Sequence, residues 1–323
     1  MPSSQRINVA ISGHGGDVAS GVENCILRDF PNASFLRLGS KVNSQDLSDQ
    51  NVAVRLPPVA DDSYLEELLK ALSSHNPDCY FPTIASEMPY LTDGFVKSLN
   101  QLGVPAFINP ISIATLWNDK LKQCELLNSE QVPFARTTAL SDDHVTQSHG
   151  PNLILKPRFG SGGRGVVKIS GSKLTNSYRE VFENYIVQDD WSEDRSEFTL
   201  GVFVSSVTGI TRTCMLMRTL QSGRSWWVRR VVNEEIESVA CEVARRHNAL
   251  YLNFQGFVGR SDYCFFEVNP RLSGSVYFQS PVLNAPSHWI TEQVLGQKYT
   301  QKTFIGEFTG TRVISETFDF PEK

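Results

Sequence analysis

The sequence of 323 residues contains no apolar run of 18 residues, so it predicts no helix long enough to cross a bilayer. It also has no excess of positive charge. Its 30 Lys and Arg residues are scattered and are outnumbered by 35 Asp and Glu residues, which gives a net charge of −5. That balance argues against a surface for nucleic acid or for an anionic membrane. Because the first residues also lack the apolar stretch of a secretory signal, we expect a cytoplasmic protein whose partners are small molecules.

Cysteine motifs are absent as well. The six cysteines lie far apart, and none of them forms a CxxC pair or a cluster with histidine. This spacing predicts neither a zinc site nor a disulfide framework. We expect reduced, buried thiols.

The first part of the chain alternates short apolar runs with helical patterns. Strands are predicted at 6–12, 34–39, 52–58 and 79–83, with helices after the first strand, at 62–74 and from Ser86. This alternation predicts a parallel α/β domain. The turn SGHGG after the first strand suggests dinucleotide binding, but the second strand ends in LGSK, without the acidic residue that a ribose hydroxyl requires. We therefore expect a structural turn or part of a substrate site there.

From Pro110 onward the pattern of apolar residues is typical of an antiparallel α+β structure. Two lobes are predicted after a first domain at 1–110: a small lobe at 111–190 and a C-terminal lobe at 191–323. The small lobe is expected to contain a helix at 112–131, two strands around the glycines and a helix at 172–184. The C-terminal lobe is expected to contain three strands, a helix beginning near Asn233 and a final hairpin that ends in YCFFEVN.

The glycine-rich stretch LKPRFGSGGRGVVKI satisfies GxGxxG. A Walker A loop is excluded because Val166 and Val167 follow Gly165 where Lys and Ser or Thr should stand. The glycines lie between two predicted strands, which favours a hairpin flap over a dinucleotide turn. A protein kinase would also need HRD and DFG elements, and the sequence has neither. Lys156, on the strand before the loop, could reach phosphate oxygens that the flap covers with its backbone N–H groups.

The segment CFFEVNPRLSGS is the second informative element. Strand alternation sends Glu267 and Asn269 to the same side, where both could give oxygen ligands to Mg²⁺, and Arg271 follows to meet phosphate. Gln255 on the neighbouring strand of the hairpin can face them. Taken alone, the pair could also be an ordinary polar pair on a strand.

Together with Lys120 and Lys156, these motifs resemble the ATP-grasp superfamily, in particular its carbamoyl-phosphate-synthetase-like branch. The resemblance covers most of the chain, and the first domain is similar to the preATP-grasp domain of that family. It implies that both lysines bind ATP phosphates and that Gln255, Glu267 and Asn269 hold the metal. Further ATP-binding residues are implied in the flap, the adenine hinge and the ribose site: Gly160, Ser161, Gly162, Gly163, Arg164 and Gly165; Gln188 and Asp189; and Glu197.

Two positions bear on this assignment. Asp189 stands where Glu is more usual in the family, which makes the hinge less secure than the metal set. Gln255 stands where many relatives have a carboxylate, a feature that the carbamoyl-phosphate-synthetase branch shares.

The resemblance implies an ADP-forming ligase that uses ATP and Mg²⁺. The site could hold two Mg²⁺ ions, and Mn²⁺ could substitute for Mg²⁺. A carboxylate would attack the γ-phosphate, and an amine would then displace phosphate from the acylphosphate, while Arg271 and Lys156 offset negative charge. One of Arg229 and Arg230 would face the cleft and hold a carboxylate.

A single copy of this length is too short for carbamoyl-phosphate synthesis, so an amino acid or peptide is the expected substrate. A phosphotransferase on the same scaffold, a regulatory protein that binds nucleotide without turnover, and a homodimeric assembly all stay open.

Overall fold

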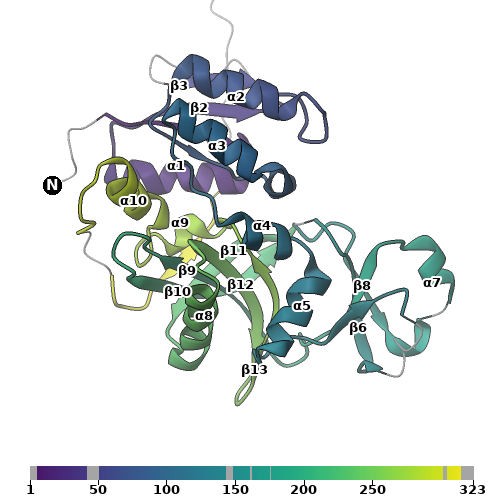
Figure 1. The fold of residues 1–323 in the computed structure, drawn as a ribbon. Coiled ribbons are helices and arrows are strands. Elements are labelled where there is room, and N and C mark those ends of the chain that lie inside the picture. Colours follow the sequence, from purple (N-terminus) through teal and green to yellow (C-terminus); the bar gives the residue numbers. More distant parts are fainter. Residues whose placement is uncertain are drawn as a thin grey trace, which may run out of the picture.

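The computed structural model describes residues 6–41, 51–142, 148–160, 162–174, 176–300 and 304–313. Three sheets organise this part of the chain. Figure 1 shows the N-terminal α/β domain above a large lobe, and a small lobe that projects to one side and carries α7 (Asn176–Val181). Within the described part, no helix is both long and apolar enough to span a membrane.

The N-terminal domain is the parallel α/β unit that the sequence predicts. Its sheet has the order β3-β2-β1-β4, and every pairing is parallel. The strands are β1 (Asn8–Ser12), β2 (Ser34–Gly39), β3 (Asn51–Arg55) and β4 (Cys79–Phe81). The helices are α1 (Asp17–Asp29), α2 (Tyr64–His75), the 3₁₀ helix η2 (Ala85–Tyr90) and α3 (Asp93–Leu102).

Neighbouring side chains of the central strand β1 pack in two different hydrophobic cores. Val9 and Ile11 pack in the core that contains α1, whereas Ala10 packs in the core that contains α2 and α3. This follows from the period of two along a strand. The apolar run from Val9 to Ile11 in β1 is therefore what a sheet covered on both faces requires.

The small lobe consists of short helices and an antiparallel sheet with the order β5-β8-β6-β7. The strands are β5 (Thr137–Ala139), β6 (Asn152–Pro157), β7 (Val167–Ser170) and β8 (Tyr185–Asp189). Strands β6 and β7 pair directly and carry the glycines between them, so the prediction of a hairpin flap is confirmed.

Two helix predictions in this lobe are wrong. The single helix expected at 112–131 is divided into α4 (Ile111–Leu116) and α5 (Lys120–Ser129). The division occurs because the carboxylate of Asp119 caps α5 by accepting from the backbone of Leu121. The helix expected at 172–184 is only a 3₁₀ turn, η3 (Gly171–Lys173), and the short α7.

The large lobe contains a six-stranded sheet with the order β13-β12-β9-β10-β11-β14. The strands are β9 (Ser196–Val204), β10 (Thr211–Gln221), β11 (Arg224–Val231), β12 (Tyr251–Val258), β13 (Tyr263–Asn269) and β14 (Thr309–Thr311). The helices are α8 (Glu234–Arg246), α9 (Val276–Gln279), α10 (Ala285–Trp289) and the π-helical turn η4 (Ile290–Val294).

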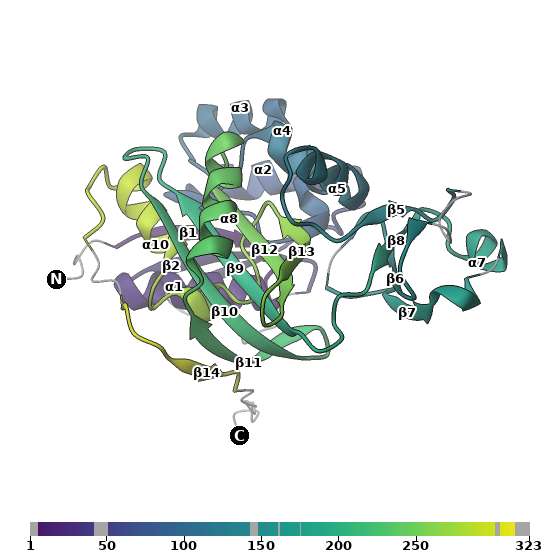
Figure 2. The same cartoon turned by 90° about the horizontal axis from the view of Figure 1, so that it is seen from below.

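This sheet is covered on both faces. Phe198, Leu200 and Met215 pack with residues of α8 on one face. Phe203 and Leu216 pack on the other face, with α9 and α10 and with α1 of the N-terminal domain. Figure 2 shows α8 and α1 on opposite sides of β9 and β10. The C-terminal helices therefore join the large lobe to the first domain.

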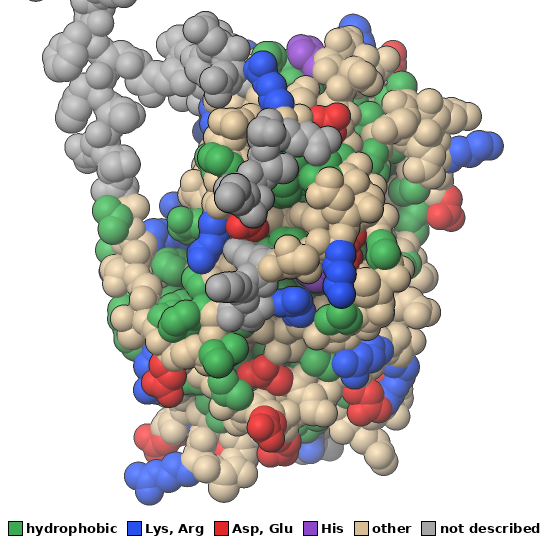
Figure 3. Space-filling model, turned by 90° about the vertical axis from the view of Figure 1, so that its left-hand side faces the viewer, with side chains coloured by type: hydrophobic (Ala, Val, Ile, Leu, Met, Phe, Trp, Pro, Cys, Tyr) green, Lys and Arg blue, Asp and Glu red, His purple; other side chains and the backbone are tan. Residues whose placement is uncertain are grey.

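The surface and the cysteines agree with the composition. Positive and negative side chains are interspersed on the face shown in Figure 3.

All six cysteines are unpaired, and all but Cys241 are buried. Burial raises the pKa of the Cys214 thiol to about 12, so this group is an unreactive core residue.

Candidate active site

Strands β12 and β13 bring the three predicted metal ligands onto one face of the large sheet. Gln255 lies opposite Glu267, and Asn253 lies opposite Asn269, so Gln255, Glu267 and Asn269 share that face. The amide of Asn269 donates to Glu267 Oε1 at 3.1 Å. The set offers one carboxylate and two neutral amide oxygens, which are hard donors suited to Mg²⁺.

Glu267 is held as an anion. Burial by itself raises the pKa of a carboxyl group, but the charges of Lys156 and Lys120 and the hydrogen bond from Asn269 outweigh it, and the pKa of Glu267 lies below its ordinary value. Arg271 adds to this effect. The carboxylate is therefore ready to bind a cation without losing a proton first.

Lys156 lies at the end of β6 and is 5% exposed. Its Nζ donates to the carbonyl of Phe266 at 3.1 Å, next to Glu267 in the chain. Burial, together with repulsion from Lys120, lowers the pKa of Lys156 to about 8, although the charge of Glu267 opposes that shift. A phosphate group bound beside Glu267 would meet this buried cation.

Lys120 lies at the first turn of α5, and its Nζ donates to the flap carbonyl of Gly160 at 2.7 Å. Asp119, the residue before it, binds Arg158 through two hydrogen bonds of 2.7 Å. This pair fixes the start of α5 against the end of β6, which positions Lys120 and Lys156. Sequence reasoning missed the pair, although Asp before a helical run is a recognisable N-cap signal.

A second missed residue supports the metal strand. Gln123 of α5 is 1% exposed, and its side-chain oxygen accepts from the backbone N–H of Val268 at 2.9 Å. Its amide donates to the carbonyl of the same residue. Val268 lies between Glu267 and Asn269, so this double contact fixes the backbone that presents both ligands.

The flap is an exposed turn that contacts Lys120 through the carbonyl of Gly160. Gly162 has a φ of +76°, a conformation that glycine adopts without strain. Its carbonyl lies against Gly223 in the β10–β11 turn, where a Cβ would approach within 3.1 Å. Gly160, Gly163, Arg164 and Gly165 belong to the same turn and are exposed, and Ser161 lies outside the described residues.

The two hinge candidates point in different directions. Gln188 is 1% exposed and faces Lys156, and its amide donates to Thr137 and to the carbonyl of Phe266. Its Oε1 has no hydrogen-bond partner in the described part of the chain. Asp189 turns to the other face of the sheet, where it binds the ring of His149 and the N–H of Gly150. The structure therefore brings Gln188 together with Lys156 and leaves the Asp189 side chain on the other face.

Glu197 reaches the metal set through an arginine that the sequence analysis missed. Arg218 donates to Glu197 at 3.0 Å and to Gln255 Oε1 at 2.9 Å. Only the register of β10 with β9 and β12 places Arg218 on this face, so no pattern within one strand could have found it. The carboxylate expected at the ribose is thus joined to a proposed metal ligand.

The register decides between the two arginines of β11. Arg230 lies opposite Leu216, which lies opposite Thr199, and Thr199 pairs with Gln255. Arg230 is therefore on the face of the metal set, and the exposed Arg229 is on the opposite face. Arg230 donates to the carbonyls of Ile305 and Gly306, each at 2.6 Å. Arg271 is partly buried, and its charge is close enough to Glu267 for the two to interact.

No protein-family model matches the sequence. No curated protein matches it significantly either. Solved structures do match. The biotin carboxylase domain of 2-oxoglutarate carboxylase from Hydrogenobacter thermophilus, in complex with MgADP, ADP and bicarbonate, superposes with a TM-score of 0.74 at 14% identity over 95% of this chain and 75% of that one.

Two other enzymes superpose as well. N5-carboxyaminoimidazole synthetase from Staphylococcus aureus with ADP has a TM-score of 0.67 at 14% identity, over 91% of this chain and 78% of that one. L-amino acid ligase from Bacillus licheniformis has a TM-score of 0.68 at 13% identity, over 90% and 75%. The chain thus has the ATP-grasp fold that its motifs predict, with a parallel N-terminal domain followed by two lobes.

Proposed function

We propose that this protein is an ATP- and Mg²⁺-dependent ligase that joins a carboxylate to an amine and releases ADP and phosphate. One observation carries the proposal: the buried Lys156 of the small lobe donates to the carbonyl of Phe266 on the large lobe, next to Glu267, whose carboxylate accepts from Asn269 on the same strand. A buried lysine and a partly exposed one, placed between a glycine flap and a hard-ligand set, suit a triphosphate.

The metal ligands would be Gln255, Glu267 and Asn269. The described residues contain no cluster of three or more His, Cys, Asp or Glu side chains that could hold a metal by themselves. A single carboxylate with two amides therefore suits an ion that takes its remaining negative ligands from phosphate oxygens. Mg²⁺ bound there would screen the phosphates and stabilise the charge that develops during transfer. Two ions, and Mn²⁺ as a substitute, are part of this proposal.

The side chains of this protein would assist the two steps of the reaction, phosphoryl transfer and amide formation. A substrate carboxylate oxygen bonds to the γ-phosphorus as the bond to the bridging oxygen of ADP breaks. Lys156, Lys120 and Arg271 would offset the charge that this transfer spreads over the phosphoryl oxygens. The amine then attacks the acyl carbon, the C–O bond to phosphate breaks, and the amine loses a proton as the amide forms.

Closure of the flap over the phosphates would exclude water during the life of the acylphosphate. The contact between Gly162 and Gly223 supports this role, because it gives the flap a place to rest on the large lobe. Gln188, with a buried free acceptor oxygen, would contact the 6-amino group of adenine.

The proposed substrates are a small carboxylate and an amine, with amino acids or peptides first among them. The likeness to an L-amino acid ligase supports this choice, and the dimer named in the biotin carboxylase structure supports a homodimer as the assembly. A cytoplasmic location is also proposed.

Pairwise screening of amino acids for ADP and phosphate release tests the function. We expect ADP and an amide product in equal amounts with at least one pair. A phosphorylated product that forms without an amine would instead identify a phosphotransferase. ATP binding with no turnover across the screen would identify a regulatory protein.

A further inference from the structure

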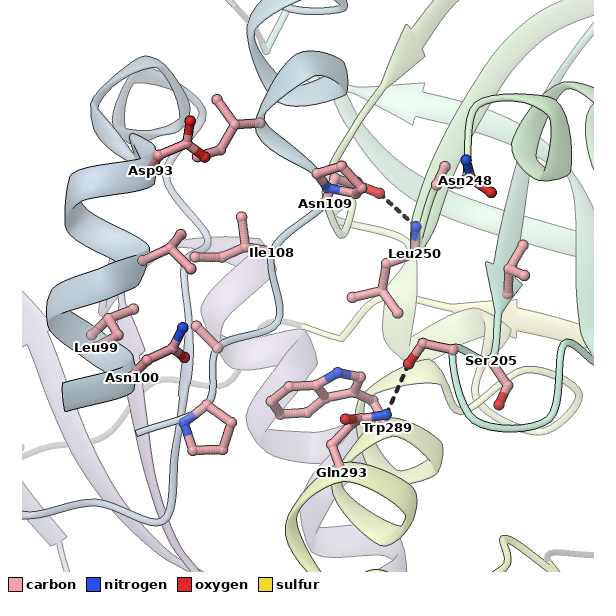
Figure 4. A pocket seen from close by; sticks show the side chains of 18 of the residues that line it. Asp93, Leu99, Asn100, Ile108, Asn109, Ser205, Asn248, Leu250, Trp289 and Gln293 are labelled. Carbon is pink, nitrogen blue, oxygen red and sulfur yellow. Dashed lines mark hydrogen bonds between the residues drawn. The ribbon is translucent and has the colours of Figure 1, made fainter. Parts of the chain in front are cut away.

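A cavity of about 840 Å³ lies between the N-terminal domain and the large lobe (Figure 4). Its walls come from α3, the segment 105–111, the β9–β10 turn, the end of α8 and the α10–η4 region. None of the proposed ATP or metal ligands lines it. Its size is in the range of small-molecule sites, which often form at domain interfaces.

The middle of the cavity is apolar. Leu99 and Ile108 come from the N-terminal side, and Leu250 and Trp289 come from the large lobe and the C-terminal helices. Figure 4 shows these side chains around the same space. A ligand with an apolar body would therefore exclude water from side chains of both domains.

Opposite charges stand on the two sides of this apolar middle. Asp93 begins α3 on one side, and Arg245 and Asn248 come from the end of α8 on the other. The side chains of Asp93, Asn100 and Asn248 are exposed and have no hydrogen-bond partner among the described residues, so a ligand would replace water there. Arg245 uses its Nε to bind Thr211 Oγ1 at 2.9 Å, which leaves its terminal nitrogens for a ligand.

These free groups differ from others in the same walls. The amide of Gln293 donates to Ser206 at 2.8 Å, and the Ser205 hydroxyl donates to Glu292 at 2.6 Å. Such groups serve the structure. The unpaired carboxylate and the guanidinium are the groups that could bind a ligand.

We propose that this cavity binds a small zwitterion with an apolar body, namely a dipeptide with apolar side chains. The ammonium group would meet Asp93, the carboxylate would meet Arg245, and the side chain would lie over Leu250 and Trp289. Because the cavity is separate from the catalytic cleft, this binding goes beyond the proposed ligase activity.

One side chain connects the cavity to the active site. Asn109 Oδ1 accepts from the backbone N–H of Leu250 at 2.7 Å, and its Nδ2 donates to the carbonyl of Pro270 at 2.8 Å. Pro270 immediately precedes Arg271. A ligand that shifts the wall at Leu250 would therefore act on the backbone that carries Arg271, and the coupling with ATP would be reciprocal.

Calorimetric titration of the full chain with leucyl-leucine, without ATP, tests the site. Val96 of α3 lines the cavity, whereas Lys97 on the same helix is exposed and does not line it. We expect Val96→Trp to fill the cavity and weaken binding at least tenfold, and Lys97→Trp to leave binding unchanged. Thermal unfolding of both variants checks that each is folded.

A second variant and a second ligand test the role of charge. Arg245→Gln, at an exposed position, should weaken binding at least tenfold. Leucyl-leucine with an acetylated amine and an amidated carboxyl group should bind at least tenfold more weakly than the free dipeptide. Equal binding of the blocked dipeptide, or unchanged binding in Val96→Trp, would overturn the proposal.

Absence of saturable binding at about 10 mM dipeptide would overturn it as well. Because the titration contains no ATP, its outcome is independent of whether the protein is a ligase. The coupling is tested by the Kd for ATP, which saturating leucyl-leucine should change in the wild type and not in Val96→Trp. An unchanged Kd in the wild type would overturn the coupling.

Discussion

Lys156 and Gln188 donate to the same acceptor. Lys156 Nζ and Gln188 Nε2 lie 3.1 and 3.2 Å from the carbonyl oxygen of Phe266. The two side chains come from adjacent antiparallel strands of the small lobe, β6 and β8, whereas Phe266 is on the metal strand of the large lobe. One carbonyl thus joins the proposed phosphate cation and the proposed adenine contact to the residue before Glu267.

Glu267→Gln should abolish turnover and leave the fold intact. The amide has nearly the same volume but removes the only anion of the proposed metal set. We expect ADP formation to fall at least ~100-fold, in the range seen when one electrostatic group is removed from an active site. Glu66→Gln, on the exposed surface of α2, is the matched control and should keep full activity. Near-normal ADP formation by Glu267→Gln would disprove the metal assignment.

Lys156 should make stability depend on pH in the protein without nucleotide or metal. Its pKa is about 8 in the folded chain, against 10.5 for an ordinary lysine. Between these values the unfolded chain binds more protons, so the contribution of Lys156 to the free energy of unfolding rises with pH, and it is lost as pH falls through 8. Urea unfolding of the wild type and of Lys156→Met should show this rise only in the wild type. Parallel pH profiles would contradict the shift.

Gln123→Met should weaken both the fold and the activity. The change leaves the buried N–H and carbonyl of Val268 without their partners, which costs about 1–3 kcal/mol for each unsatisfied group. Because the same backbone presents Glu267 and Asn269, kcat should fall more than the loss of folded protein explains. Glu125→Met on the exposed side of α5 is the control. A variant of reduced stability with unchanged kcat at low temperature would limit Gln123 to a structural role.

Gly162→Val should separate ATP cleavage from ligation. Valine is strained at a φ of +76°, so the flap should close poorly and the acylphosphate should hydrolyse. We expect ADP to exceed the ligated product several-fold, whereas Lys156→Ala should lower both together. Gly296→Val, with a φ of +61° and open space around it, controls for strain elsewhere. Equal amounts of ADP and product in Gly162→Val would show that the flap does not protect the intermediate.

Several features of the site follow from the sequence because they depend on local geometry. A strand alternates its side chains, so the spacing of Glu267 and Asn269 predicts a shared face, and the register with Gln255 confirms it. Glycines between two β-rich runs likewise predict a hairpin, which the pairing of β6 with β7 confirms. Turn and strand preferences depend on a few neighbouring residues, so they can be read from a single sequence.

Other features were decided only by the tertiary structure. Alternation could say that Arg229 and Arg230 point to opposite faces, but only the register across β10, β9 and β12 shows that Arg230 shares the face of Gln255. The contact of Gln123 with Val268 spans 145 positions of the chain. The helix expected at 172–184 is short, and Asn184 has a φ of +61°, which a continuous helix cannot contain. The periodicity of a sequence predicts the structure of one segment at a time. The strand register, the contact of Gln123 and the length of the helix depend instead on hydrogen bonds between distant segments, because buried backbone groups must find partners when the lobes pack together.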